Sequence, residues 1–211
     1  MHHSSIIQKT FFATIFCVFC ASMYNKNEEM IFILQIQKTD NANGQLLNNQ
    51  SNSIVYEMRI LTKKGNEKPI LMKENYYFFE DKQDQENPPY KFGYADGSEE
   101  DALNAIKEGE VYTLKWQKMP SKTWSDTTNS IHIEKSKKHP HTNHTFIHPA
   151  NGIGQLAGCK SLCLQKDLQI DKAGNVKVKN GHFGTKKAIK EIRNLYDAVG
   201  ATRFELWYKP I

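Results

Sequence analysis

The feature that most constrains this chain is that only one segment, residues 185–199, has the apolar spacing of a long amphipathic helix. In this segment Ala188, Ile189, Ile192 and Leu195 recur at intervals of three and four residues. This spacing puts them on one face of a helix. Gly200 follows directly, as is typical of a helix C-terminus. The sequence therefore predicts one long helix near the C-terminal end, with one face buried.

The other apolar runs are short and either alternate with polar residues or are rich in β-branched and aromatic residues, as strands are. They are Ile31–Lys38, Ile54–Leu61, Tyr76–Phe79, Val111–Trp116, Ile131–Glu134, Thr145–His148 and Arg203–Tyr208. Asp167–Val178 has the pattern of two strands joined by a turn at residues 171–175. Residues 80–98 are polar, contain two adjacent prolines and lack any hydrophobic period, which favours a surface loop.

These patterns together predict an α+β fold that is mainly β. We expect a single antiparallel, barrel-like domain over residues 30–211, with one long C-terminal helix and a loop insertion near residues 80–98. The composition agrees, since 39% hydrophobic and 24% charged residues are typical of a globular domain and exclude collagen, coiled coil and full disorder.

The N-terminal segment bears on the compartment. Thr10–Met23 is an apolar run of signal-peptide length, preceded by Lys9 and followed by polar residues, and it is shorter than the ~20 residues that span a bilayer. We interpret residues 1–29 as a signal peptide, cleaved before Ser22, and a short polar spacer. The mature chain would then be periplasmic or secreted, without a membrane span. Translation from Met30 is the alternative, and it implies a cytoplasmic protein.

The net charge of +5 comes from basic residues scattered along the chain, so no basic stripe indicates nucleic acid. We expect neither a nucleic-acid partner nor a cofactor.

The most chemically suggestive stretch runs from His148 to Cys159. A strand ends at His148, Asn151 and Gly152 form a bend, and a Gly158-Cys159 pair follows. A nearby imidazole or backbone N–H groups lower the pKa of a thiol and make it nucleophilic. Glycine allows close approach of a substrate. The candidate catalytic residues are therefore Cys159 and His148, with Asn151, Gly152 and Gly158 as binding residues. A buried Cys159 that acts as a small hydrophobe is the alternative.

A second cluster contains His139, His141, His144 and His148. Imidazoles and thiolates suit zinc, but His144 and His148 on one strand would lie about 13 Å apart at ~3.3 Å per residue. We expect a solvated basic loop and no metal site.

Several of these segments resemble the bacterial and phage family called domain of unknown function 5675, over roughly residues 31–208. The matching segments are Ile31–Lys38, Gly44-Gln45-Leu46, Ala105 to Tyr112, the Ile147-His148-Pro149-Ala150-Asn151 run with Gly158-Cys159, and the terminal helix and strand. The resemblance implies a fold but no known activity.

The Ile-His segment and the downstream Gly-Cys pair also resemble L,D-transpeptidase catalytic domains more distantly. That resemblance implies Cys159 as the nucleophile and His148 on the substrate or oxyanion side. Those enzymes have a histidine directly before the Gly-Cys pair, where this chain has Ala157. Two functions follow as expectations. One is an exported or phage-associated protein that acts on or binds peptidoglycan peptides or another cell-envelope peptide, as a Cys-dependent transpeptidase or hydrolase. The other is a non-catalytic binding or structural module with a buried Cys159.

Overall fold

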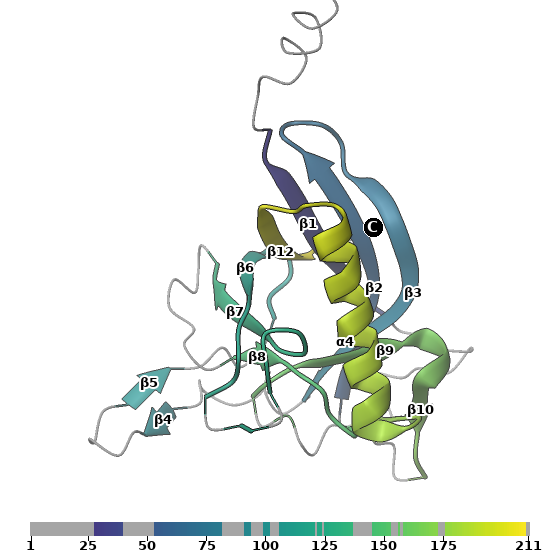
Figure 1. Ribbon diagram of the computed structural model, residues 1–211. Coiled ribbons are helices and arrows are strands. Elements are labelled where there is room, and N and C mark those ends of the chain that lie inside the picture. Colours follow the sequence, from purple (N-terminus) through teal and green to yellow (C-terminus); the bar gives the residue numbers. More distant parts are fainter. Residues whose placement is uncertain are drawn as a thin grey trace, which may run out of the picture.

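The fold was analysed in a computed structural model of the chain (Figure 1). The structure describes residues 28–39, 53–81, 91–93, 99–101, 106–120, 122–123, 125–136, 145–152, 156, 158–172 and 176–209. The expected signal peptide, and His139, His141 and His144 of the histidine cluster, lie outside these residues.

In the described residues, eight strands form one curved sheet in the order β8-β7-β6-β12-β1-β2-β3-β9. The strands are β1 (Met30–Lys38), β2 (Ser53–Lys64), β3 (Ile70–Asp81), β6 (Val111–Trp116), β7 (Ile131–Lys135), β8 (Phe146–Ile147), β9 (Ser161–Leu164) and β12 (Arg203–Tyr208). All neighbouring pairs are antiparallel except β1 and β12, which are parallel. The prediction of a mainly β, barrel-like fold is confirmed, and the sheet that was predicted as antiparallel is so except at the β1–β12 pair.

The two edge strands of this sheet meet, which nearly closes the barrel. Ile147, at the end of β8, forms a parallel bridge with Lys160, directly before β9. The His148 N–H donates to the Lys160 carbonyl (3.0 Å), and the Lys160 N–H donates to the Phe146 carbonyl (2.8 Å). We call this junction the seam.

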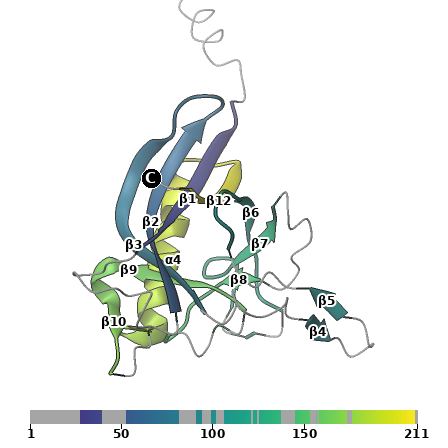
Figure 2. The same ribbon diagram turned by 180° about the vertical axis from the view of Figure 1, so that it is seen from behind.

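Helix α4 (Gly181–Ala198) covers the concave side of the barrel. It lies in front of β1–β3 in Figure 1 and behind them in the reverse view of Figure 2. Its buried residues Ala188, Ile189 and Ile192 join the same core cluster as Phe32 and Phe204. The predicted long C-terminal helix is thus confirmed, although it begins at Gly181 rather than Thr185.

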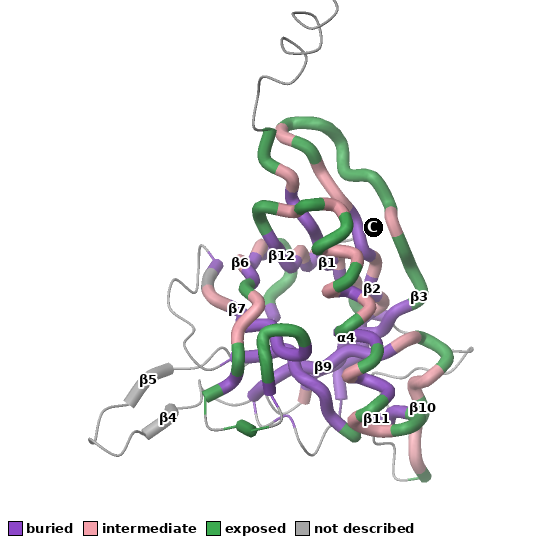
Figure 3. Tube along the Cα trace, viewed as in Figure 1, coloured by how far each residue is buried: buried purple, intermediate pink, exposed green. Residues whose placement is uncertain are grey.

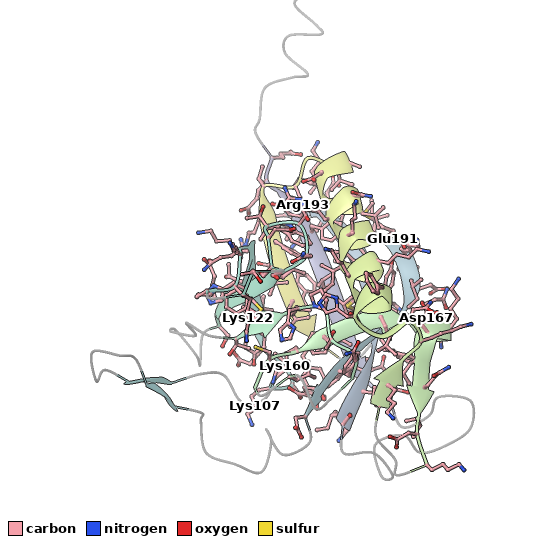
Figure 4. The ribbon with its side chains drawn as sticks, turned by 60° about the horizontal axis from the view of Figure 1, so that its bottom comes forward. Lys107, Lys122, Lys160, Asp167, Glu191 and Arg193 are labelled. Atoms are coloured by element: carbon pink, nitrogen blue, oxygen red, sulfur yellow. The ribbon has the colours of Figure 1, made fainter. Side chains whose placement is uncertain are left out.

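Helix α4 is also fastened by polar contacts on two opposite sides. Glu191 accepts hydrogen bonds from Lys73 of β3 and from the Tyr76 hydroxyl. Arg193 donates to the Thr127 carbonyl in the loop after β6 (3.2 Å). Figure 4 shows Glu191 and Arg193 on these two sides of the helix.

Besides α4, two short two-stranded ribbons and a 3-10 helix lie outside the main sheet in the described residues. Strands β4 (Lys91–Gly93) and β5 (Glu99–Asp101) form a separate ribbon. The described residues of the segment predicted as a loop, 80–81 and 91–93, lie in strands β3 and β4. Strands β10 (Leu168–Ile170) and β11 (Val176–Val178) form a second ribbon after the short 3-10 helix η2 (Gln165–Asp167). This ribbon agrees with the two-strand pattern in Asp167–Val178.

Strands β2 and β3 extend beyond the barrel as a hairpin arm. The outer half of β3 is largely exposed, in contrast to its buried half from Tyr76 onward (Figure 3). Ile70 and Leu71 on this arm are 64% and 50% exposed. The strand predicted as Tyr76–Phe79 is therefore only the buried part of a longer one.

Among the described residues, no helix has both the length and the apolar character needed to cross a lipid bilayer.

Candidate functional site

The seam brings the segments of His148 and Cys159 side by side on the outside of the barrel. The bridge pairs Ile147 with Lys160, and both side chains are fully buried. Because successive side chains point to opposite faces of a sheet, the residues that flank each of them point outward. His148 and Cys159 thus share one face.

The register of the seam sets which of these residues are direct neighbours. With Ile147 paired to Lys160, Cys159 lies beside Phe146, and His148 lies beside Ser161, whose hydroxyl donates to the His148 carbonyl (2.7 Å). Cys159 and His148 are diagonal to each other. At ~4.8 Å between strands and ~3.3 Å per residue, their backbone positions are about 8 Å apart.

Cys159 is buried beside two apolar side chains. Its side chain is 6% exposed and forms a small cluster with Met119 and Phe146. The preceding Gly158 has a φ of +86°, which favours glycine, so this glycine has a conformational reason to be present. The second thiol, Cys163, is fully buried, and both burial and the nearby Asp167 carboxylate raise its pKa.

His148 is also buried, with 5% of its surface exposed. Its Nδ1 lies 2.9 Å from the Pro149 carbonyl. Burial lowers the pKa of His148 below the ordinary value of 6.5, the Pro149 hydrogen bond opposes this shift, and the positive charges of His182 and Lys122 add to it. The imidazole is therefore neutral at pH 7.

Asn151 and Gly152 connect the seam to α4 and to the ribbon. Asn151 Oδ1 accepts a hydrogen bond from the backbone N–H of His182 in the first turn of α4 (2.6 Å). Gly152 forms a bridge with Lys177, and a Cβ on Gly152 would lie 2.5 Å from the Val176 carbonyl oxygen. Both residues have structural roles here, and their role in ligand binding stays a prediction.

Inside the barrel, opposite the outward-facing thiol, lies a buried ion pair that the sequence analysis did not identify. Lys160 Nζ is 3.1 Å from Glu80 Oε2, and both side chains are 0% exposed. The Tyr56 hydroxyl donates to Glu80 Oε1 (2.5 Å), and the Ile106 N–H donates to Oε2 (3.2 Å). Figure 4 labels Lys160 in this region.

The alternation of β3 and β9 accounts for this pair once the strands are known, although the four consecutive aromatic residues of Tyr76–Phe79 show no period of two in the sequence itself. Glu80 follows Tyr76 and Phe78 at intervals of two residues, and Lys160 precedes Leu162 by two. Because all three of these apolar residues belong to the main core, the period of two predicts that Glu80 and Lys160 point inward as well.

In the described residues, no group of three or more His, Cys, Asp or Glu side chains is arranged to hold a metal ion. The expectation of no metal site stays a prediction, because most of the histidine cluster is outside these residues.

Comparison of the chain with models of known families, with curated proteins and with solved structures yields no match. The resemblances to domain of unknown function 5675 and to L,D-transpeptidases stay predictions.

The lowered pKa of His148 predicts a pH dependence of stability. The unfolded chain takes up a proton near pH 6.5, whereas the folded imidazole resists it, so the free energy of unfolding should fall as pH drops from about 6.5 toward the lowered pKa. The slope for one such group is at most about 1.4 kcal/mol per pH unit. Urea unfolding of the native protein and of His148→Asn, at several pH values between 5 and 7.5, measures it.

We expect His148→Asn to show a smaller loss of stability than the native protein over this range. His182→Asn is the matched comparison. Burial also lowers the pKa of His182, but this residue is more exposed, so its replacement should change the pH dependence of stability less than His148→Asn does. Equal pH profiles for the native protein and His148→Asn would contradict the prediction.

Proposed function

We propose that the protein is a non-catalytic binding module of the cell envelope, exported through its N-terminal segment, that binds peptidoglycan or another envelope peptide. The observation that carries the non-catalytic assignment is the burial of Cys159 against Met119 and Phe146. A nucleophilic thiol needs a polar, accessible environment that stabilises the thiolate. A buried, 6% exposed position beside Met119 and Phe146 instead favours a packing role.

A second candidate is a Cys-dependent peptidoglycan transpeptidase or hydrolase. It is favoured by one observation, that His148 and Cys159 face the same side of the seam, with His148 in the neutral form that can accept a proton. In that function Cys159 is the nucleophile and His148 the base, and the site must open to admit a peptide.

Alkylation of the thiols separates the two functions. In a Cys17→Ser/Cys20→Ser background, we expect iodoacetamide at pH 7 to label Cys159 and Cys163 roughly 100-fold more slowly in the folded protein than in urea, because labelling requires local opening. His148→Ala should leave the rate at Cys159 unchanged once any difference in stability is accounted for. Peptide mass spectrometry assigns the labelled residue.

Cys163, which is fully buried, serves as the internal control for unfolding. The non-catalytic function would be contradicted if Cys159 alone is labelled rapidly and if His148→Ala slows this labelling and moves its pH midpoint upward. That result would support the enzyme.

A further inference from the structure

Strands β6 and β12 pair over only part of their length and then separate, and we call this opening in the barrel the split. The pairing of these strands runs from Trp207–Val111 to Glu205–Thr113 and stops there within the described residues. Beyond that point a groove of about 380 Å³ lies between the two strands and α4. Its lining includes Lys115, Arg193, Arg203, Trp116, Tyr196 and Phe204.

Backbone groups in the split face the groove. The Tyr208 N–H donates to the Glu110 carbonyl, so the backbone carbonyl of Glu110 is directed toward β12. Residues two apart in a strand present their backbone N–H and C=O groups to the same side. The backbone N–H and C=O of Leu114 are therefore directed toward β12, and those of Phe204 toward β6. An extended peptide could pair with these groups, as added strands do at open sheet edges.

The groove is basic, and none of its described lining residues is acidic. Lys115 and Arg203 are 63% and 47% exposed, so their charged ends are accessible. Their carboxylate neighbours include Glu134 for Lys115 and Glu29 and Glu205 for Arg203, all outside the lining.

Arg193, which lines the groove, is held in place by several contacts. Its guanidinium lies 5.1 Å from the centre of the Trp116 ring and 5.7 Å from that of Tyr196. Asp197 accepts from its Nε (2.8 Å), and the Thr127 carbonyl accepts from its Nη1 (3.2 Å). A guanidinium fixed in this way is preorganised to bind a carboxylate.

Trp116, which lines the same groove, carries an unpaired donor. Its indole Nε1 is buried and has no hydrogen-bond partner in the described structure. An unpaired buried donor costs free energy. Because Nε1 itself is buried, a ligand oxygen would pair with it only after the Trp116 ring shifts toward the groove.

We propose that this groove binds an acidic peptide in extended conformation, with its backbone paired to β6 or β12 and its carboxylates on Lys115, Arg193 and Arg203. The inference rests on the proposed function as a binding module and assigns it a site and a ligand class. The groove is separated from the seam by β7 and β8, so the site is distinct from Cys159 and His148.

The test uses the full chain and a fluorescein-labelled octapeptide of alternating Glu and Val, followed by fluorescence anisotropy. We expect binding of this peptide and at least roughly 10-fold weaker binding of the matched Gln–Val peptide. Lys115→Glu should weaken binding of the acidic peptide by roughly 5-fold or more. Lys177→Glu is the matched control, since Lys177 is 62% exposed and also pairs with a carboxylate, Asp171, and it should change binding by less than about twofold.

Trp116→Phe is a second variant, which removes the indole N–H and keeps an aromatic ring. We expect it to weaken binding about 3-fold or more, with circular dichroism confirming a native fold. The inference would be overturned if the acidic and neutral peptides bind equally, or if Lys115→Glu and Lys177→Glu have equal effects. It would also be overturned if free glutamate displaces the labelled peptide at the same concentration as the unlabelled peptide does.

Co-sedimentation with purified peptidoglycan separates this inference from the proposed function. If Lys115→Glu and Trp116→Phe change neither co-sedimentation with peptidoglycan nor binding of the acidic peptide, the assignment of the groove is wrong, but the proposed binding function is still supported. If Cys159 proves to be a reactive thiol, the proposed function fails while the groove result is judged on the peptide alone.

Discussion

Replacement of Lys160 by methionine is expected to lower the free energy of unfolding by about 3–5 kcal/mol. The change leaves the Glu80 carboxylate, which is 0% exposed, inside the barrel without its cation. The Tyr56 hydroxyl and the Ile106 N–H still donate to the carboxylate, but as neutral donors they do not neutralise its charge. Urea unfolding at pH 7 measures the loss.

The double variant Lys160→Met/Glu80→Gln should be clearly more stable than Lys160→Met alone, because no unpaired charge remains buried. Lys177→Met is the control for removal of an exposed lysine, and we expect it to change stability by no more than about 0.5 kcal/mol. A loss in Lys160→Met no larger than in Lys177→Met would show that the ion pair is not buried as described.

Phe32→Ala is expected to cost about 3–5 kcal/mol. Phe32 is 0% exposed, and its ring makes edge-to-face contacts with Tyr196 of α4 and Phe204 of β12, each with ring centres 5.6 Å apart. The substitution therefore leaves a cavity where helix and sheet meet. Urea unfolding followed by circular dichroism gives the change.

Ile70→Ala is the matched control, since Ile70 is also a large apolar residue but is 64% exposed on the hairpin arm. It should change stability by no more than about 0.5 kcal/mol. Similar losses for Phe32→Ala and Ile70→Ala would contradict the packing of α4 against the concave face of the barrel.

The sequence was most informative where one face of an element is buried and the other exposed. The spacing of Ala188, Ile189 and Ile192 predicted α4, and all three are in the core. Strand β3 was harder to predict. Its outer half, residues 70–75, is largely exposed on both faces and therefore has no alternating apolar pattern. Only its part from Tyr76 onward could be recognised.

The parallel pairing of β1 with β12 had no local signal. The partners Phe32 and Phe204 are far apart in the chain, and a period of two in each strand does not specify the neighbour or its direction. The candidate site was likewise only partly predictable. The sequence indicated that His148 and Cys159 approach each other, whereas the diagonal register follows from the bridge between Ile147 and Lys160.

The central position of β12 also sets when the barrel can form during synthesis. Strand β12 stands between β1 and β6, so the edge of β1 lacks its neighbour until the last described strand has been made. At about 5–20 residues per second, on the order of ten seconds separates the synthesis of Lys38 from that of Arg203. Over that interval the β1–β2–β3 segment has an open strand edge that can pair with other chains, and the synthesis of β12 ends this exposure.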